Sequence, residues 1–198
     1  MPLISEDIGA ELMRAYAAPD RHYHNLTHIE ALLSIAHQHQ GALADAEAIE
    51  AAIWFHDAVY DTRRHDNEDK SAELAIDRLK GATTQERLGR IAEMIRATAS
   101  HQLPEFPNPE ALRDCELFLD MDLAVLGAAT EDYDSYAAAV RREYAWVPEP
   151  LWIGGRRKVL EKFLARTAIY MSPQFQASLE AAARRNLVQE LVMLTQVG

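Results

Sequence analysis

The sequence has almost no cysteine and no long apolar segment, and these two absences exclude whole classes of protein. One cysteine in 198 residues cannot form an internal disulfide framework or a cysteine-rich zinc module. No run of about 18 apolar residues occurs, so we expect no membrane span and no membrane partner. The N-terminal residues lack a basic stretch followed by an apolar core, so the sequence predicts no signal peptide and a cytoplasmic protein.

Positive charge is also scarce. The chain has 20 lysines and arginines against 31 acidic residues, which gives a formal net charge of −11. Nucleic-acid polymers are bound through clustered lysine and arginine, so this balance argues against them as partners. A small phosphorylated ligand is still compatible with it, because such a ligand needs only a few local cations.

Strand patterns are nearly absent, whereas helical periodicity covers most of the chain. Apolar residues make up 48% of the sequence, enough for a real core. These features predict one all-α domain, a bundle of about eight to ten helices. We expect the C-terminal third, from about residue 128 to 198, to pack as an accessory layer of helices.

Capping residues and periodicity predict the bounds of the helices. Hydroxyl side chains precede several apolar-periodic runs, and the predicted N-caps are Ser5, Thr27, Thr130 and Ser172. The third helix ends in a segment that is apolar on nearly all sides, so it should lie in the middle of the bundle. Gly154-Gly155 favours a break in the helical pattern before residue 156. The predicted helices cover about residues 5–17, 27–40, 45–60, 67–80, 84–101, 109–127, 130–146, 156–169 and 172 onward.

His56 and Asp57 stand at the end of the most apolar predicted helix. Burying an imidazole beside a carboxylate is costly unless the two are paired or bind a cation. Neighbours on a helix lie about 100° apart, so both could reach one ion beside that edge. One nitrogen and one oxygen ligand suit Mn, Fe, Ni, Zn or Mg. The alternative is a core histidine next to a capping carboxylate.

Two other places hold residues of the same kind. His24 and His28 have i, i+4 spacing, which puts them on one face if their helix begins early enough. They could instead be loop histidines bonded to the backbone. Asp120 and Asp122 lie in an apolar helix, where residues two apart point to roughly opposite sides. At most one of these two carboxylates should therefore face a given ion.

The order His, His-Asp, Asp resembles the signature of the HD superfamily of metal-dependent phosphohydrolases. In that superfamily four side chains project from a helical bundle onto one divalent metal. Further segments are similar to a bacterial subgroup of predicted HD phosphohydrolases: Tyr-His-Asn-x-x-His, Phe-His-Asp-x-x-Tyr-Asp, Asn-Glu-x-x-Ser and Leu-Asp-x-Asp-Leu. The resemblance covers about residues 21–127 and implies an HD-like core there.

The resemblance also implies a set of metal ligands. His28 matches the first ligand because an apolar helix follows it directly, and His24 matches an auxiliary histidine found one turn earlier in some members. Asp122 matches the last ligand, with Asp120 as the alternative. The implied cofactor is one divalent ion, and its implied ligands are His28, His56, Asp57 and Asp122.

Residues 56–62 resemble the H-D-x-x-E-D-T segment of guanosine-tetraphosphate hydrolases, in which the Glu-Asp pair helps to activate water. Here Asp61 occupies the Asp position, whereas Tyr60 replaces the Glu. Glu68 could supply a carboxylate from the polar stretch that follows. The predicted catalytic acid–base residues are therefore Asp61 first and Glu68 second.

Basic and histidine side chains near these motifs form the one local patch that could bind phosphate. The patch consists of Arg21, Arg63, Arg64, His65 and Lys70. The predicted substrate-binding residues are Arg21, His24, Arg63, His65, Lys70 and His101, and His101 could instead be an additional metal ligand. The predicted function is a metal-dependent phosphohydrolase that cleaves a phosphoester or pyrophosphate bond of a small nucleotide-like substrate. The alternatives are a non-catalytic metal- or nucleotide-binding module and a di-iron oxygenase, which would need about six His or Asp ligands.

Overall fold

The computed structural model describes residues 2–106 and 108–196. Within these ranges the chain forms nine α-helices, two short 3-10 helices and no strand. The all-α prediction and the expected number of helices are confirmed. No helix in the described ranges is long and apolar enough to cross a bilayer. The chain divides into two compact units between Asp122 and Leu123, near the predicted boundary at residue 127. That the whole chain is a single domain stays a prediction.

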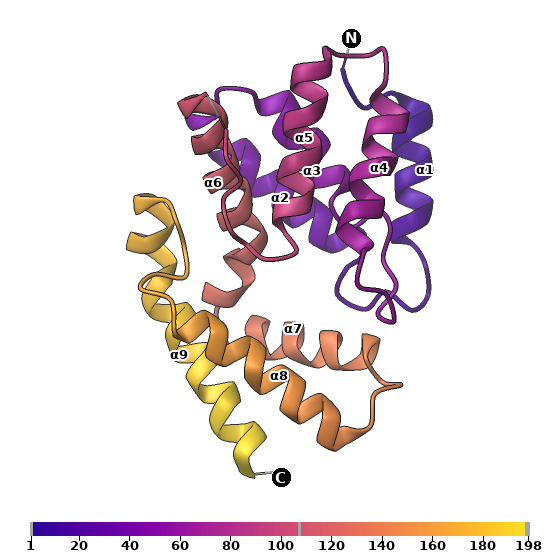
Figure 1. Ribbon diagram of the computed structural model, residues 1–198. Coiled ribbons are helices and arrows are strands. Elements are labelled where there is room, and N and C mark those ends of the chain that lie inside the picture. Colours follow the sequence, from indigo (N-terminus) through magenta and orange to yellow (C-terminus); the bar gives the residue numbers. More distant parts are fainter. Residues whose placement is uncertain (1, 107, 197–198) are drawn as a thin grey trace. The chain divides into compact units, whose positions relative to one another are not determined.

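The first unit is built around α3. Its elements are α1 (Glu6–Tyr16), α2 (Leu26–Gln38), η1 (Gln40–Ala42), α3 (Ala46–Phe55), α4 (Asn67–Leu79), α5 (Gln85–Ala97) and α6 (Pro109–Asp122). The α3 helix packs against α2, α4, α5 and α6 and lies among them in Figure 1. Its alanines allow close approach of the neighbouring helices, and Ile49, Ile53 and Phe55 are fully buried. The predicted central place of this helix is therefore confirmed.

The beginning of α3 is fixed by carboxylates. Asp45 caps the helix, because its side chain accepts the N–H of Ala48 at 3.2 Å, and Arg90 donates to Asp45 at 2.9 Å. Asp114 of α6 accepts the backbone N–H groups of Ala44 at 2.8 Å and Asp45 at 2.9 Å. These bonds anchor one end of α3, and the opposite end carries His56.

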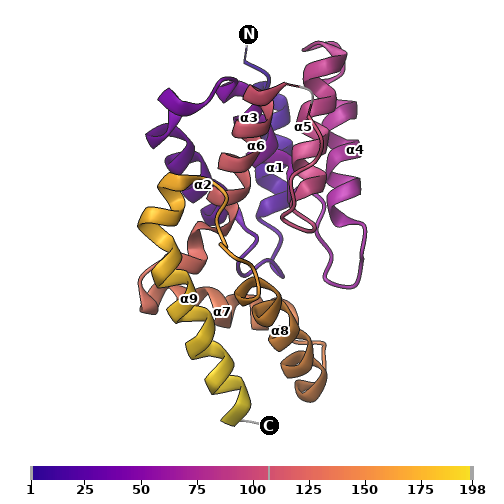
Figure 2. The ribbon, with the colours of Figure 1, turned by 60° about the vertical axis from the view of Figure 1, so that its left-hand side comes forward.

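The second unit consists of η2 (Leu123–Gly127), α7 (Thr130–Glu143), α8 (Glu149–Leu164) and α9 (Pro173–Gln196). The long helix α9 packs against η2 and α8, and Figure 2 shows α8 and α9 side by side. A Cβ at position 127 would lie 2.7 Å from the Cβ of Leu179, so only glycine fits where η2 meets α9.

Several predicted helix starts are confirmed and others are wrong. Ser5 caps α1 through the N–H of Ile8 at 3.4 Å, and α9 begins at Pro173, directly after Ser172. Thr130 is not an N-cap, because it is the first residue of α7 and the cap position is Ala129.

The predicted start of the eighth helix is also wrong. It begins at Glu149, directly after Pro148, so Gly154-Gly155 lies inside α8 and not before it. Pro150 in the first turn has the backbone angle that a helix start needs, and this favours the earlier beginning.

Candidate metal centre

Asn25, not Thr27, starts α2 and thereby places His28. The Asn25 side chain accepts the N–H groups of Thr27 at 2.9 Å and His28 at 3.4 Å, which makes it the N-cap. His28 therefore stands buried in the first turn of α2. His24 precedes the helix, so the two histidines do not share a helix face. The His24 ring stacks on Tyr60, with ring centroids 4.3 Å apart.

His56 is the C-cap of α3, which ends at Phe55 and does not continue to Tyr60 as predicted. Its Nδ1 lies 2.8 Å from the carbonyl oxygen of Ile53. A carbonyl can only accept, so this contact requires a proton on Nδ1. The bond fixes the ring and aims its Nε2 at the nitrogens and oxygens described next.

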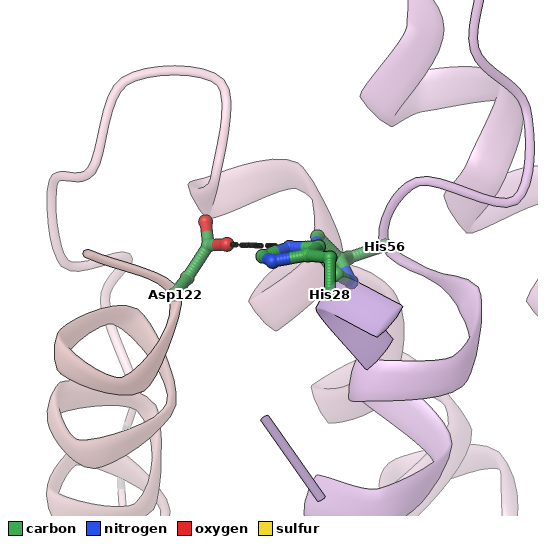
Figure 3. Close-up of side chains that lie close together, drawn as sticks. All are labelled: His28, His56 and Asp122. Atoms are coloured by element: carbon green, nitrogen blue, oxygen red, sulfur yellow. Dashed lines mark hydrogen bonds and ion pairs between the residues drawn. The ribbon is translucent and has the colours of Figure 1, made fainter. Parts of the chain in front are cut away.

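Asp122 is the last residue of α6, and its carboxylate points towards the imidazole rings of His28 and His56 (Figure 3). Its Oδ1 lies 3.4 Å from His28 Nε2 and 3.5 Å from His56 Nε2. The two Nε2 atoms are 3.2 Å apart. Three donor atoms from α2, the end of α3 and α6 thus form a nearly equilateral triangle that could hold a metal ion.

Asp57 extends this group on one side. Its Oδ2 lies 3.0 Å from His56 Nε2 and 3.9 Å from His28 Nε2. The side chains of His28 and His56 are only 3% and 1% exposed, whereas those of Asp57 and Asp122 are 14% and 13% exposed. The group is therefore dry on its histidine side and open to solvent on its carboxylate side.

The electrostatics of the group favour a cation between the carboxylates. Burial lowers the pKa of His28. Burial acts on His56 in the same direction, but the charge of Asp57 and the bond to Asp122 outweigh it and raise the pKa of His56. Burial opposes ionisation of Asp57 and Asp122, yet the histidines hold the pKa of both carboxyls well below its usual range. Two carboxylates carry more negative charge than one imidazolium neutralises, and a divalent cation would match them.

The donor set fits a metal ion in spacing and in chemistry. Ligands at about 2.0–2.1 Å from a tetrahedral ion are about 3.3–3.4 Å from one another. The measured edges of 3.2, 3.4 and 3.5 Å agree with that spacing. Imidazole nitrogen with carboxylate oxygen suits Zn, Fe, Ni or Mn. The structure brings Asp122 into the group, whereas the alternative residue Asp120 is not among its members.

Arg21, predicted to contact phosphate, holds the backbone around the His-Asp pair. Its guanidinium donates to the carbonyls of Asp57 at 2.6 Å, Ala58 at 3.0 Å and His24 at 3.1 Å. The ring of Tyr16 lies 5.0 Å from its central carbon. The carbonyls that follow α3 are thus bonded to a cation, as expected at a helix C-terminus, and this explains why the helix stops there.

Two residues of the Asn-Glu-x-x-Ser segment hold the same turn from α4. The Asn67 side chain accepts the N–H of Asp61 at 3.1 Å and donates to its carbonyl at 3.0 Å. The Ser71 hydroxyl accepts the N–H of Val59 at 3.1 Å and donates to its carbonyl at 3.3 Å. The sequence showed this spacing as a motif, but its role as a backbone support was missed.

The predicted acid–base residues lie in the loop that follows the His-Asp pair. Asp61 is exposed, and its Oδ1 accepts the N–H of Arg63 at 2.9 Å. Glu68 is half-buried in the first turn of α4 and makes no hydrogen bond or ion pair with any described residue. Asp61 therefore stabilises the turn of the loop, whereas the Glu68 carboxylate bonds to no other described residue.

The predicted cations fall into different environments. Arg63 and His65 are exposed in the loop before α4, whereas Lys70 forms an ion pair with Glu73 at 2.7 Å. His101 lies in the turn after α5, and its Nε2 is 2.9 Å from Oδ2 of Asp122. Of these four residues, His101 is the one in direct contact with a member of the histidine–aspartate group, which consists of His28, His56, Asp57 and Asp122.

We expect Arg21→Ala to lower the free energy of unfolding by about 2–3 kcal/mol, because buried carbonyls lose a charged donor. Arg21→Lys should recover less than half of this loss, since an ammonium cannot bond in the forked geometry. Chemical denaturation followed by circular dichroism measures both. Arg64→Ala is the control, because Arg64 pairs only at the surface with Asp66. Unchanged stability of Arg21→Ala would contradict the backbone role.

Comparison with known proteins was made by sequence and by structure. A scan against protein-family models, a search of curated proteins and a search of solved structures each found no match. The likeness to the HD superfamily therefore stays an expectation drawn from the motif residues of this chain.

Proposed function

We propose that the protein is a metal-dependent phosphohydrolase that uses water to cleave a phosphoester or pyrophosphate bond in a small phosphorylated substrate such as a nucleotide. The observation that carries the proposal is the triangle of donor atoms from His28, His56 and Asp122, with edges of 3.2–3.5 Å. The HD-like order of these residues in the chain supports the reaction class.

In this proposal a divalent ion is held by His28, His56, Asp57 and Asp122. Such an ion lowers the pKa of a coordinated water and polarises a phosphoryl oxygen. The protein's part is to hold the ligands in place. The bond from His56 Nδ1 to Ile53 orients one imidazole, and Arg21 holds the backbone of Asp57. The buried histidines keep one side dry, so water and substrate approach from the carboxylate side.

The proton of the attacking water needs an acceptor. Glu68 is the better-suited of the two predicted carboxylates, because its oxygens are not engaged with other described residues, whereas Asp61 accepts a backbone N–H. Arg63 and His65 are exposed in the same loop, where a phosphate group could recruit them.

The test begins with metal-depleted protein reloaded separately with Zn²⁺, Mn²⁺, Ni²⁺ or Mg²⁺. Bound metal is measured by mass spectrometry, and phosphate release is measured with a panel of nucleotides and other phosphate esters. We expect about one ion per chain and release that depends on it. Asp57→Ala should lose both, because it removes an anionic ligand and leaves the other buried groups unbalanced.

Glu30→Ala provides a matched control, since Glu30 is an exposed acid on α2 in the same unit. It should behave as the wild type does. Full metal content and full activity in Asp57→Ala would make the proposed centre wrong. Metal binding by the wild type without phosphate release from any compound would instead support the metal-binding module.

A further inference from the structure

The backbone at His101 has a conformation that side chains rarely adopt. Among the described residues, it is the one residue other than glycine with a positive φ, 49°. Its N–H donates to the carbonyl of Ala97 at 2.8 Å, which closes the turn at the end of α5. Glycine and asparagine adopt this left-handed conformation more readily than histidine does. A histidine here suggests that the imidazole has a use which outweighs the backbone cost.

The contacts of Asp122 indicate one such use. Its Oδ2 lies 2.9 Å from His101 Nε2, whereas its Oδ1 faces His28 at 3.4 Å and His56 at 3.5 Å. The two carboxylate oxygens are therefore divided between different partners. The Asp122 side chain is 13% exposed, so a water could replace a weak partner and let the carboxylate rotate.

We propose that His101 is a positioning residue for Asp122. An Nε2–H of His101 donates to Oδ2 and thereby keeps Oδ1 directed at His28 and His56. The left-handed turn at the end of α5 brings the imidazole to the carboxylate. This inference rests on the proposed metal centre and adds a residue that acts through a ligand.

The test compares variants of the full chain by their affinity for Zn²⁺ alone, measured by calorimetric competition with a chelator. Gln and Met have the same length and carry the same backbone cost, but only Gln has a donor that reaches as far as Nε2. We expect His101→Met to weaken Zn²⁺ binding by about 10–100-fold, the usual effect of losing a support to a metal ligand. His101→Gln should retain most of the wild-type affinity.

His101→Gly separates positioning from folding. Glycine adopts a φ of 49° without strain, so this variant should unfold at the wild-type temperature or above while its Zn²⁺ affinity falls as in His101→Met. If the wild type binds Zn²⁺ and both His101→Gly and His101→Met bind it with the same affinity, the positioning role is wrong but the metal centre is not. Failure of the wild type to bind Zn²⁺, Mn²⁺ or Ni²⁺ would overturn it together with the metal centre. If the Zn²⁺ affinities of the wild type and the variants are as expected but the wild type releases no phosphate from any compound, the positioning role is supported and only the hydrolase function is rejected.

Discussion

Asp122→Asn is expected to weaken binding of a divalent ion by more than about 100-fold, because even residues that merely support a ligand change affinity by up to that factor. Asparagine keeps the shape of the side chain and removes its negative charge. The same change at Asp120 should alter the affinity by less than about threefold, since Asp120 does not belong to the histidine–aspartate group. Calorimetric titration with Zn²⁺ measures both variants under the same conditions.

The comparison of these two aspartates is matched closely. Both lie near the end of α6, where Asp120 is buried and Asp122 is half-buried. Of the two, Asp122 belongs to the group that could hold a metal ion, with its carboxylate 3.4 and 3.5 Å from the Nε2 atoms of His28 and His56. Loss of affinity in Asp120→Asn with retention in Asp122→Asn would transfer the ligand role to Asp120. Loss in neither variant would remove α6 from the metal centre.

The helices themselves could be predicted because their causes are local. Apolar spacing and a hydroxyl cap at Ser5 are enough to place α1, and the alanine-rich apolar segment before His56 indicates a central helix. The residues of the candidate metal centre could also be recognised from local sequence. A histidine and an aspartate side by side in an apolar segment are costly wherever the segment folds.

The ends of the helices near the site could not be predicted, because distant residues determine them. The periodicity of residues 45–60 would allow α3 to continue past Phe55. The helix ends there because Arg21, which precedes α2 in the chain, donates hydrogen bonds to the carbonyls of Asp57 and Ala58. Local periodicity carries no information about such a partner, and an arginine close in sequence to the motif residues indicates a phosphate contact rather than a support of the backbone.

The sequence indicates that His101 could face the site, but not that its partner there is Asp122. One residue lies in a turn after α5 and the other at the end of α6, and only the packing of these two helices brings them together. The choice between Asp120 and Asp122 is similar, since helical spacing shows that one of them should face the group but not which one. The unusual φ of His101 is a property of the folded chain alone.

Glu190→Ala is expected to destabilise the second unit by about 3–5 kcal/mol, the usual cost of removing one partner of a buried ion pair. Arg156 of α8 donates to the Glu190 carboxylate at 2.7 and 2.9 Å, and their side chains are only 7% and 9% exposed. The Tyr133 hydroxyl also donates to Glu190, and burial raises the pKa of this hydroxyl so that it keeps its proton. The variant leaves a buried guanidinium and a buried hydroxyl without their acceptor.

A double variant decides whether the stability lost in Glu190→Ala comes from the missing ion pair or from the buried, unpaired charge of Arg156 that the single variant leaves behind. Arg156→Met with Glu190→Leu replaces both partners by apolar groups of similar size, and such replacements are often neutral or stabilising. We therefore expect the double variant to recover most of the stability lost in Glu190→Ala. Denaturant unfolding followed by the fluorescence of Trp146 and Trp152, in a Trp54→Phe background, reports on the second unit. A double variant as unstable as Glu190→Ala would mean that α7, α8 and α9 depend on the ion pair itself, because apolar packing could not replace it.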